Sequence, residues 1–199
     1  MIPLIAIAFR VAFVPLDSML VIARELSIFA AAALLLVLVR RVEGQPWSSI
    51  GLRSITAGKA VVTVVIGLLA CAAATVIGIL LIQTLGLQFG GSTASFKPGP
   101  WLMCLIVLRA GVVEEFCFRA YAISRLESLT SRRVLSVGLP LVIFAAFHAS
   151  QGLGGVLLAF LLGGVLSCLY LWRRNLWVNM AVHFLVDFIP NIVLPILAG

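Results

Sequence analysis

Long apolar stretches follow one another along almost the whole chain, separated by short segments of Gly, Pro and basic residues. A helix needs about 20 residues to cross a hydrocarbon core, so we expect membrane-spanning helices at residues 18–39, 60–85, 101–123, 154–172 and 176–197. A shorter stretch covers residues 139–149, with Pro140 in its first turn. Residues 1–14 are also apolar, but Arg10 interrupts them, and we expect a short, tilted or interfacial helix there. Continuous runs indicate helices rather than a membrane barrel.

The composition supports a protein embedded in a membrane. The 199 residues are 63% hydrophobic and 11% charged, with a mean hydropathy of +1.22, against roughly 45–50% apolar and about 25% charged in soluble domains. We therefore predict an all-α fold, a polytopic transmembrane bundle of about six to eight helices. Residues 1–199 are expected to form a single membrane domain with its catalytic helices within 101–199. None of the four cysteines has the spacing of a disulfide framework.

The net charge of +7 follows the topology of such a bundle and does not require a nucleic-acid partner. Basic residues gather in short loops, as the positive-inside rule expects. If successive spans cross the membrane in alternating directions, most of the loop cations fall on the same side: Arg40, Arg41, Arg53, Lys59, Arg125, Arg132, Arg133, Arg173 and Arg174. Among the loop cations only Lys97 falls on the opposite side. We expect a multi-pass protein of the cell membrane with its basic loops in the cytoplasm.

Two adjacent carboxylates, Glu114 and Glu115, lie within the apolar stretch 101–123. A charge at the centre of a membrane helix costs roughly 2.5–3.5 kcal/mol on insertion scales, and such residues usually serve a function. Glu115 and Arg119 are four residues apart and share a helix face, so we expect an ion pair between them. Glu114 then points about 100° away around an α-helix, toward another partner.

Other charged residues in apolar stretches have no obvious partner nearby. Arg24 and Glu25 are adjacent, so on an α-helix they point about 100° apart and are expected to be poor partners for each other. Arg109 precedes Glu114 by five residues, which places it roughly 140° away on an α-helix. We therefore expect Arg109 to extend toward the far membrane surface or to pair with another helix, or else to bind substrate.

Two further polar groups come from later apolar stretches. His148 follows Phe144 by four residues, and Asp187 follows His183 by four. A carboxylate and an imidazole can together position and deprotonate water, and an imidazole oriented by a carboxyl group can donate to an oxyanion. The same atoms suggest an alternative, a zinc ion bound by Glu114, His148 and His183 with an open position for water.

These three groups of residues, one from each of three apolar stretches, resemble in order and spacing the motifs of the CPBP intramembrane protease family. That family is also called Abi or CAAX prenyl protease 2-like. The matching positions are Glu114-Glu115-x-x-x-Arg119, Phe144-x-x-x-His148 and His183-x-x-x-Asp187. A segment at residues 48–53 also looks like one found upstream in that family. The resemblance covers roughly residue 47 to the end of the chain.

This resemblance implies a membrane-embedded endopeptidase whose substrate is a peptide or lipidated protein, as in CAAX processing. It implies that Glu114 and His148 activate water, that His183 and residue 187 stabilise the oxyanion, and that Arg119 anchors Glu115. The family is often described as metalloproteases, but the motifs leave metal dependence open. One departure matters, because the last position is commonly Asn in the family and is Asp187 here. An ionised Asp would repel an oxyanion, so it must be protonated or act only by orienting His183.

Two other classes of function fit the same pattern. Chains of Glu, His and Asp also form proton relays, so a proton-coupled transporter or channel is an alternative. The absence of a detectable inverted repeat weighs against it. The other alternative is a non-catalytic immunity or scaffold protein of the membrane.

Overall fold

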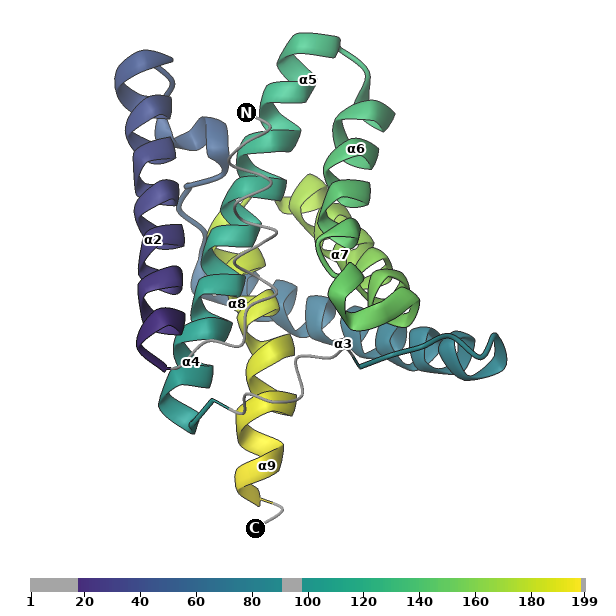
Figure 1. The fold of residues 1–199 in the computed structure, drawn as a ribbon. Coiled ribbons are helices and arrows are strands. Elements are labelled where there is room, and N and C mark those ends of the chain that lie inside the picture. Colours follow the sequence, from purple (N-terminus) through teal and green to yellow (C-terminus); the bar gives the residue numbers. More distant parts are fainter. Residues whose placement is uncertain (1–17, 91–97, 198–199) are drawn as a thin grey trace.

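The computed structural model describes residues 18–90 and 98–197, and all their regular structure is helical (Figure 1). This confirms the predicted all-α fold. The elements join into six continuous helical segments within the described ranges, the lower end of the predicted number. The helix expected at residues 1–14 and the cation Lys97 lie outside these ranges.

Several of the helices change their winding along their length. The first segment is α2 (Ser18–Val37) with the π-helical turn η1 (Leu38–Val42). A short 3-10 turn, η2 (Trp47–Ile50), leads to α3 (Ala57–Thr84). The third segment joins α4 (Pro100–Arg109), the π-helical η4 (Ala110–Ile123) and α5 (Ser124–Thr130). The remaining elements are α6 (Arg133–Ala146), η5 (Ala149–Gln151), α7 (Gly152–Arg173), and α8 (Leu176–Phe188) with its extensions η6 (Ile189–Val193) and α9 (Leu194–Leu197).

Four helices are long and apolar enough to cross a membrane: Met19–Val42, Ala57–Thr84, Ala149–Arg173 and Leu176–Leu197. They carry large apolar side chains on their outer surfaces, including Leu34, Leu69 and Leu80, as expected for contact with lipid. The segment from α4 to α5 was also predicted as a span but is not among the four. Its middle holds four charged residues within eleven positions, Arg109, Glu114, Glu115 and Arg119.

This charged segment lies inside the bundle. Its π-helical part, η4, packs against α2, α6, α7 and α8, and Figure 1 shows it standing between α2 and the α6–α7 pair. A buried apolar cluster surrounds it, made of residues from α2, η1, η2, η4, α7 and α8: Ala32, Val39, Ile50, Val113, Phe116, Ala120, Ile123, Tyr170 and Leu176. The charges of η4 therefore face other helices rather than lipid.

The connections at one end of the bundle are tied together by polar contacts. Arg125 Nε donates to Glu43 Oε2 at 2.7 Å, and Arg174 donates to Glu127 at 2.7 Å. The Asn175 side chain donates to the Arg53 carbonyl at 2.8 Å. These contacts place helix α5 and the loops after η1, η2 and α7 at the same end, as the alternation of spans predicted.

The prediction that Pro140 opens a helix was wrong. α6 begins at Arg133, seven residues earlier, and Pro140 lies within it. In the structure Ser136 is buried and its hydroxyl donates to the Arg132 carbonyl at 2.9 Å, so a polar sequence forms the first turns.

Candidate active site

The two glutamates lie on η4, a π-helical stretch of 14 residues. π-helices are rare, usually one turn long, and frequent at functional sites. Gly111 brings η4 against α8, because a Cβ at this position would lie 3.0 Å from backbone atoms of Phe184. This close approach places Glu115 beside His183 of α8.

Glu115 accepts hydrogen bonds from three side chains and is fully buried. Arg119 NH1 lies 2.8 Å and His183 Nδ1 lies 2.7 Å from Glu115 Oε1. Asn179 Nδ2 donates to Oε2 at 2.9 Å. The predicted pairing of Glu115 with Arg119 is confirmed, and both carboxylate oxygens are satisfied.

Arg119 connects this carboxylate to α6 and α7. Its guanidinium carbon lies 4.1 Å from the centre of the Phe144 ring, and NH2 donates to the Gly163 carbonyl at 3.3 Å. A Cβ at position 163 would lie 2.9 Å from Phe144 and 3.0 Å from Arg119 NH2. Gly163 therefore permits close packing, as expected of small residues between membrane helices, and also contacts the site.

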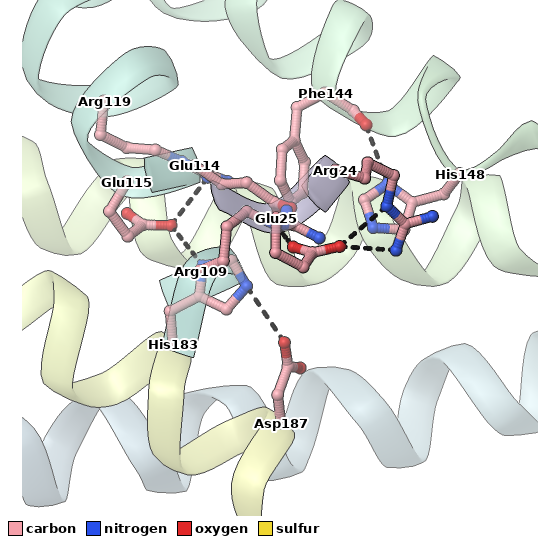
Figure 2. Close-up of polar contacts among 10 residues, drawn as sticks. All are labelled: Arg24, Glu25, Arg109, Glu114, Glu115, Arg119, Phe144, His148, His183 and Asp187. Carbon is pink, nitrogen blue, oxygen red and sulfur yellow. Dashed lines mark hydrogen bonds and ion pairs between the residues drawn. The ribbon is translucent and has the colours of Figure 1, made fainter. Parts of the chain in front are cut away.

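Phe144 lies between the two histidines (Figure 2). Its ring centre is 4.9 Å from that of His148 and 6.3 Å from that of His183. His148 Nδ1 lies 2.9 Å from the Phe144 carbonyl oxygen. Since a carbonyl oxygen only accepts, we assign the proton of a neutral His148 to Nδ1, which leaves Nε2 as an acceptor.

Asp187 contacts His183 more loosely than Glu115 does. The Nε2 atom of His183 is 3.5 Å from Asp187 Oδ2, and the Asp187 side chain is 34% exposed. The predicted contact between these residues is present. The closer partner of the imidazole, however, is Glu115 at Nδ1, an interaction that the motif spacing did not predict.

α8 begins in a way that fixes the level of His183. The Asn175 side-chain oxygen accepts from the Val178 backbone N–H at 3.2 Å, which caps the helix. Asn179 follows one turn later and also donates to the Leu166 carbonyl of α7 at 2.9 Å. The sequence analysis did not identify Asn179 as a site residue. An amide in an apolar stretch, four residues before His183 and so on the same helix face, could have indicated it.

Glu114 has a different partner from its neighbour. Arg109 NH1 donates to Glu114 Oε1, and Arg109 Nε donates to Glu25 Oε2 of α2 at 2.7 Å. The expectation that Arg109 is a poor local partner for Glu114 was therefore wrong. It assumed α-helical winding, whereas in a π-helix hydrogen bonds link residues five apart, so such residues lie about one turn from each other.

Arg24 and Glu25 also form a pair, contrary to expectation. Arg24 donates from Nε at 2.9 Å and from NH2 at 2.6 Å to Glu25 Oε1. The prediction considered only the directions in which the side chains leave the helix. The Arg side chain is long enough to fold back to its neighbour.

A zinc ion on Glu114, His148 and His183 stays a prediction. Among the residues that the structure describes, no group of three or more His, Cys, Asp and Glu side chains is arranged to hold a metal ion. Instead, Glu114 accepts from Arg109, and both His183 nitrogens face carboxylates. As arranged, these residues do not fit a metal ion.

Comparison with known proteins agrees with the sequence motifs and with the helical membrane fold. Residues 96–189, which include η4, Phe144, both histidines and Asp187, match the family model of the Type II CAAX prenyl endopeptidase Rce1-like proteins. This match confirms the predicted CPBP family for the segment that carries the site, and it indicates a membrane protease. No curated protein and no solved structure matches the chain.

Proposed function

We propose that this protein is an endopeptidase that hydrolyses a peptide bond near the cytoplasmic membrane face in a CAAX-type substrate, a prenylated protein or a related peptide. One observation carries the assignment of the base. The two adjacent glutamates differ in availability, because Glu115 is buried with both oxygens bonded, whereas the Glu114 side chain is 20% exposed. Within the described residues, Glu114 is bonded to Arg109 alone, and through one oxygen.

In this proposal Glu114 Oε2 and His148 Nε2 hold the attacking water. Both atoms are acceptors, so each can take one of the two water hydrogens. As the water oxygen bonds to the carbonyl carbon, one proton passes to the Glu114 carboxylate. When the C–N bond breaks, that proton goes to the leaving amine. The second water proton passes from the new carboxyl group to the amine, so the products are a carboxylate and an ammonium group.

His183 is proposed to stabilise the oxyanion. Glu115 accepts a hydrogen bond from Nδ1–H and orients the ring. In its protonated form, in which both ring nitrogens are donors, His183 donates from Nε2–H to the developing negative charge. Asp187 is 3.5 Å from this nitrogen and partly exposed. Its proposed role is to orient His183, because an ionised carboxylate would repel the oxyanion.

The proposed side of cleavage follows from the basic loops. Arg53 and Arg174 lie in connecting loops and Arg125 in helix α5, and polar contacts join these segments at one end of the bundle. By the positive-inside rule this end faces the cytoplasm, where prenylated C-termini would be presented.

The test is cleavage of a synthetic CAAX peptide, with and without a prenyl group, by the purified protein in detergent or liposomes. Glu114→Gln and His148→Ala are each expected to lower kcat by about 10²–10⁴-fold, the contribution typical of a general base. The matched control is Glu43→Gln, which removes a carboxylate that is bonded to Arg125 and Tyr121 instead. Wild-type cleavage by Glu114→Gln would overturn the mechanism, and a parallel arm with a chelator tests the zinc prediction.

The same variants separate the two alternatives. A proton-coupled transporter would show substrate flux in proteoliposomes and no peptide hydrolysis. An immunity or scaffold protein would keep its cellular function in Glu114→Gln. Either result would replace the hydrolase assignment.

A further inference from the structure

Four charged side chains form a continuous chain from α2 to the glutamate proposed as the base (Figure 2). Their order is Arg24, Glu25, Arg109 and Glu114, each bonded to the next. We propose that Arg109 is a positioning residue that fixes the Glu114 carboxylate, and that Glu25 of α2 fixes Arg109. The proposal rests on the proposed function of Glu114. It assigns a role in positioning the base to α2, a helix that lies outside the segment matched by the family model.

The geometry of Arg109 suits this role. Its Nε donates to Glu25 at 2.7 Å while its NH1 donates to Glu114. A guanidinium group is planar and holds its donors in a rigid fork, so fixing one side of the fork fixes the other. A lysine carries a single nitrogen and cannot hold two carboxylates in this defined geometry.

Burial shows which member of the chain is the fixed point. The Glu25 side chain is 0% exposed, compared with 17% for Arg109, 20% for Glu114 and 26% for Arg24. A buried carboxylate is tolerated only when it is paired and hydrogen-bonded, and both Glu25 oxygens are bonded to arginines. Glu25 therefore holds Arg109 in one place, while the more exposed Glu114 lies at the open end of the chain.

The charges of the chain also balance. Two carboxylates alternate with two guanidinium groups, so the group is neutral when all four are ionised. An arginine that captured a substrate carboxylate would need positive charge that protein carboxylates do not already balance. Arg109 instead uses two of its nitrogens on protein carboxylates, which favours a role in positioning over one in substrate binding.

The experiment compares Glu25→Gln, Arg109→Gln, Arg109→Lys and the double variant Glu25→Gln/Arg109→Gln in the peptide cleavage assay. A displacement of a catalytic group by about 1 Å can cost up to 100-fold, so we expect kcat to fall about 10- to 100-fold in each variant. KM should stay within about twofold, since an interaction that acts on the chemical step changes kcat rather than uniform binding. Arg109→Lys keeps the charge but loses the fork, and it should not restore kcat.

The double variant distinguishes positioning from a structural effect. If Glu25 acts only through Arg109, the two changes are not additive, and the double variant should be no slower than Arg109→Gln. The double variant also removes both charges together, so it leaves neither of them buried without a partner. Glu43→Gln, which changes a carboxylate in a separate ion pair, is the control and should keep wild-type kcat.

Three results would overturn the proposal: wild-type kcat in Glu25→Gln, a raised KM with unchanged kcat in the Arg109 variants, or additive losses in the double variant. The second result would mean that Arg109 binds substrate. A failure of the proposed function is a separate outcome, because it would appear as wild-type cleavage by Glu114→Gln. An inactive Glu114→Gln together with a fully active Glu25→Gln would reject the positioning proposal alone.

Discussion

Glu114 and Glu115 are neighbours in sequence, yet the structure gives them opposite surroundings. Glu115 is buried, and three side chains from η4 and α8 satisfy both its oxygens. Glu114 is 20% exposed and is joined to Arg109 through one oxygen. The comparison teaches that neighbouring carboxylates on one helix can have opposite surroundings: three side chains hold Glu115, whereas in the proposed function Glu114 is the one available for chemistry.

The largest loss of stability and cleavage is expected when Arg119, the buried cation bonded to Glu115, is removed. Arg119→Ala leaves a buried carboxylate without its cation, and breaking a buried ion pair costs about 3–5 kcal/mol. We expect a large fall in thermal stability in detergent and loss of cleavage. Arg41→Ala, which removes an exposed arginine from the end of α2 and η1, should leave the melting temperature nearly unchanged. Wild-type stability of Arg119→Ala would mean that Glu115 is not an organising residue.

Removing the amide that bonds Glu115 should have a smaller effect. Asn179→Ala leaves Glu115 Oε2 and the Leu166 carbonyl without their donor, and an unsatisfied buried group costs about 1–3 kcal/mol. Cleavage should fall together with stability, because Glu115 orients His183. Asn191→Ala is the matched control, since Asn191 is exposed and donates to the Asp187 carbonyl. Equal melting temperatures for the two variants would contradict the account of Glu115.

Gly111→Ala tests the contact between η4 and α8 that brings Glu115 to His183. The added Cβ would lie 3.0 Å from the Phe184 backbone, and overpacking of this kind costs about 1–3 kcal/mol. We expect lower stability and lower kcat, measured by thermal unfolding and peptide cleavage. Gly58→Ala adds a Cβ with no atom within 4 Å and should have neither effect. A fully active Gly111→Ala would show that this spacing is not required.

The smallest effect is expected at the polar end of the bundle. Glu127→Gln weakens the contact between Glu127 and Arg174. The Glu127 side chain is 26% exposed and the Arg174 side chain is 30% exposed. Partly exposed pairs contribute about 0–1 kcal/mol, so unfolding and cleavage should both stay close to wild type. A loss as large as that of Asn179→Ala would mean that this end of the bundle, rather than the Glu115 cluster, governs stability.

The contacts that follow α-helical spacing could be predicted from the sequence. Glu115 and Arg119, and likewise His183 and Asp187, are four residues apart, and both contacts are present. The helical membrane fold was also predictable, because the apolar stretches are long and continuous. Local spacing was sufficient for these two pairs, whose partners are four residues apart on one helix.

The remaining contacts depend on features that the sequence pattern does not display. The Arg109–Glu114 pair arises where the winding changes from α4 to η4, and a single α-helical period of about 3.6 residues per turn does not reveal that change. Glu25 reaches Arg109 from another helix, 84 residues away along the chain. Asn179 acquires its role only when α8 packs against η4 and α7. The contacts of Glu25 with Arg109 and of Asn179 with Glu115 are tertiary, and no periodicity encodes them.

Paired measurements of peptide cleavage and thermal unfolding on Glu114→Gln and Glu115→Gln test the central claim most directly. We predict that Glu114→Gln lowers kcat by about 10²–10⁴-fold and melts within a few degrees of wild type, whereas Glu115→Gln loses both cleavage and stability. Cleavage by Glu114→Gln at the wild-type rate, or equal losses of stability in both variants, would contradict the division between the two glutamates.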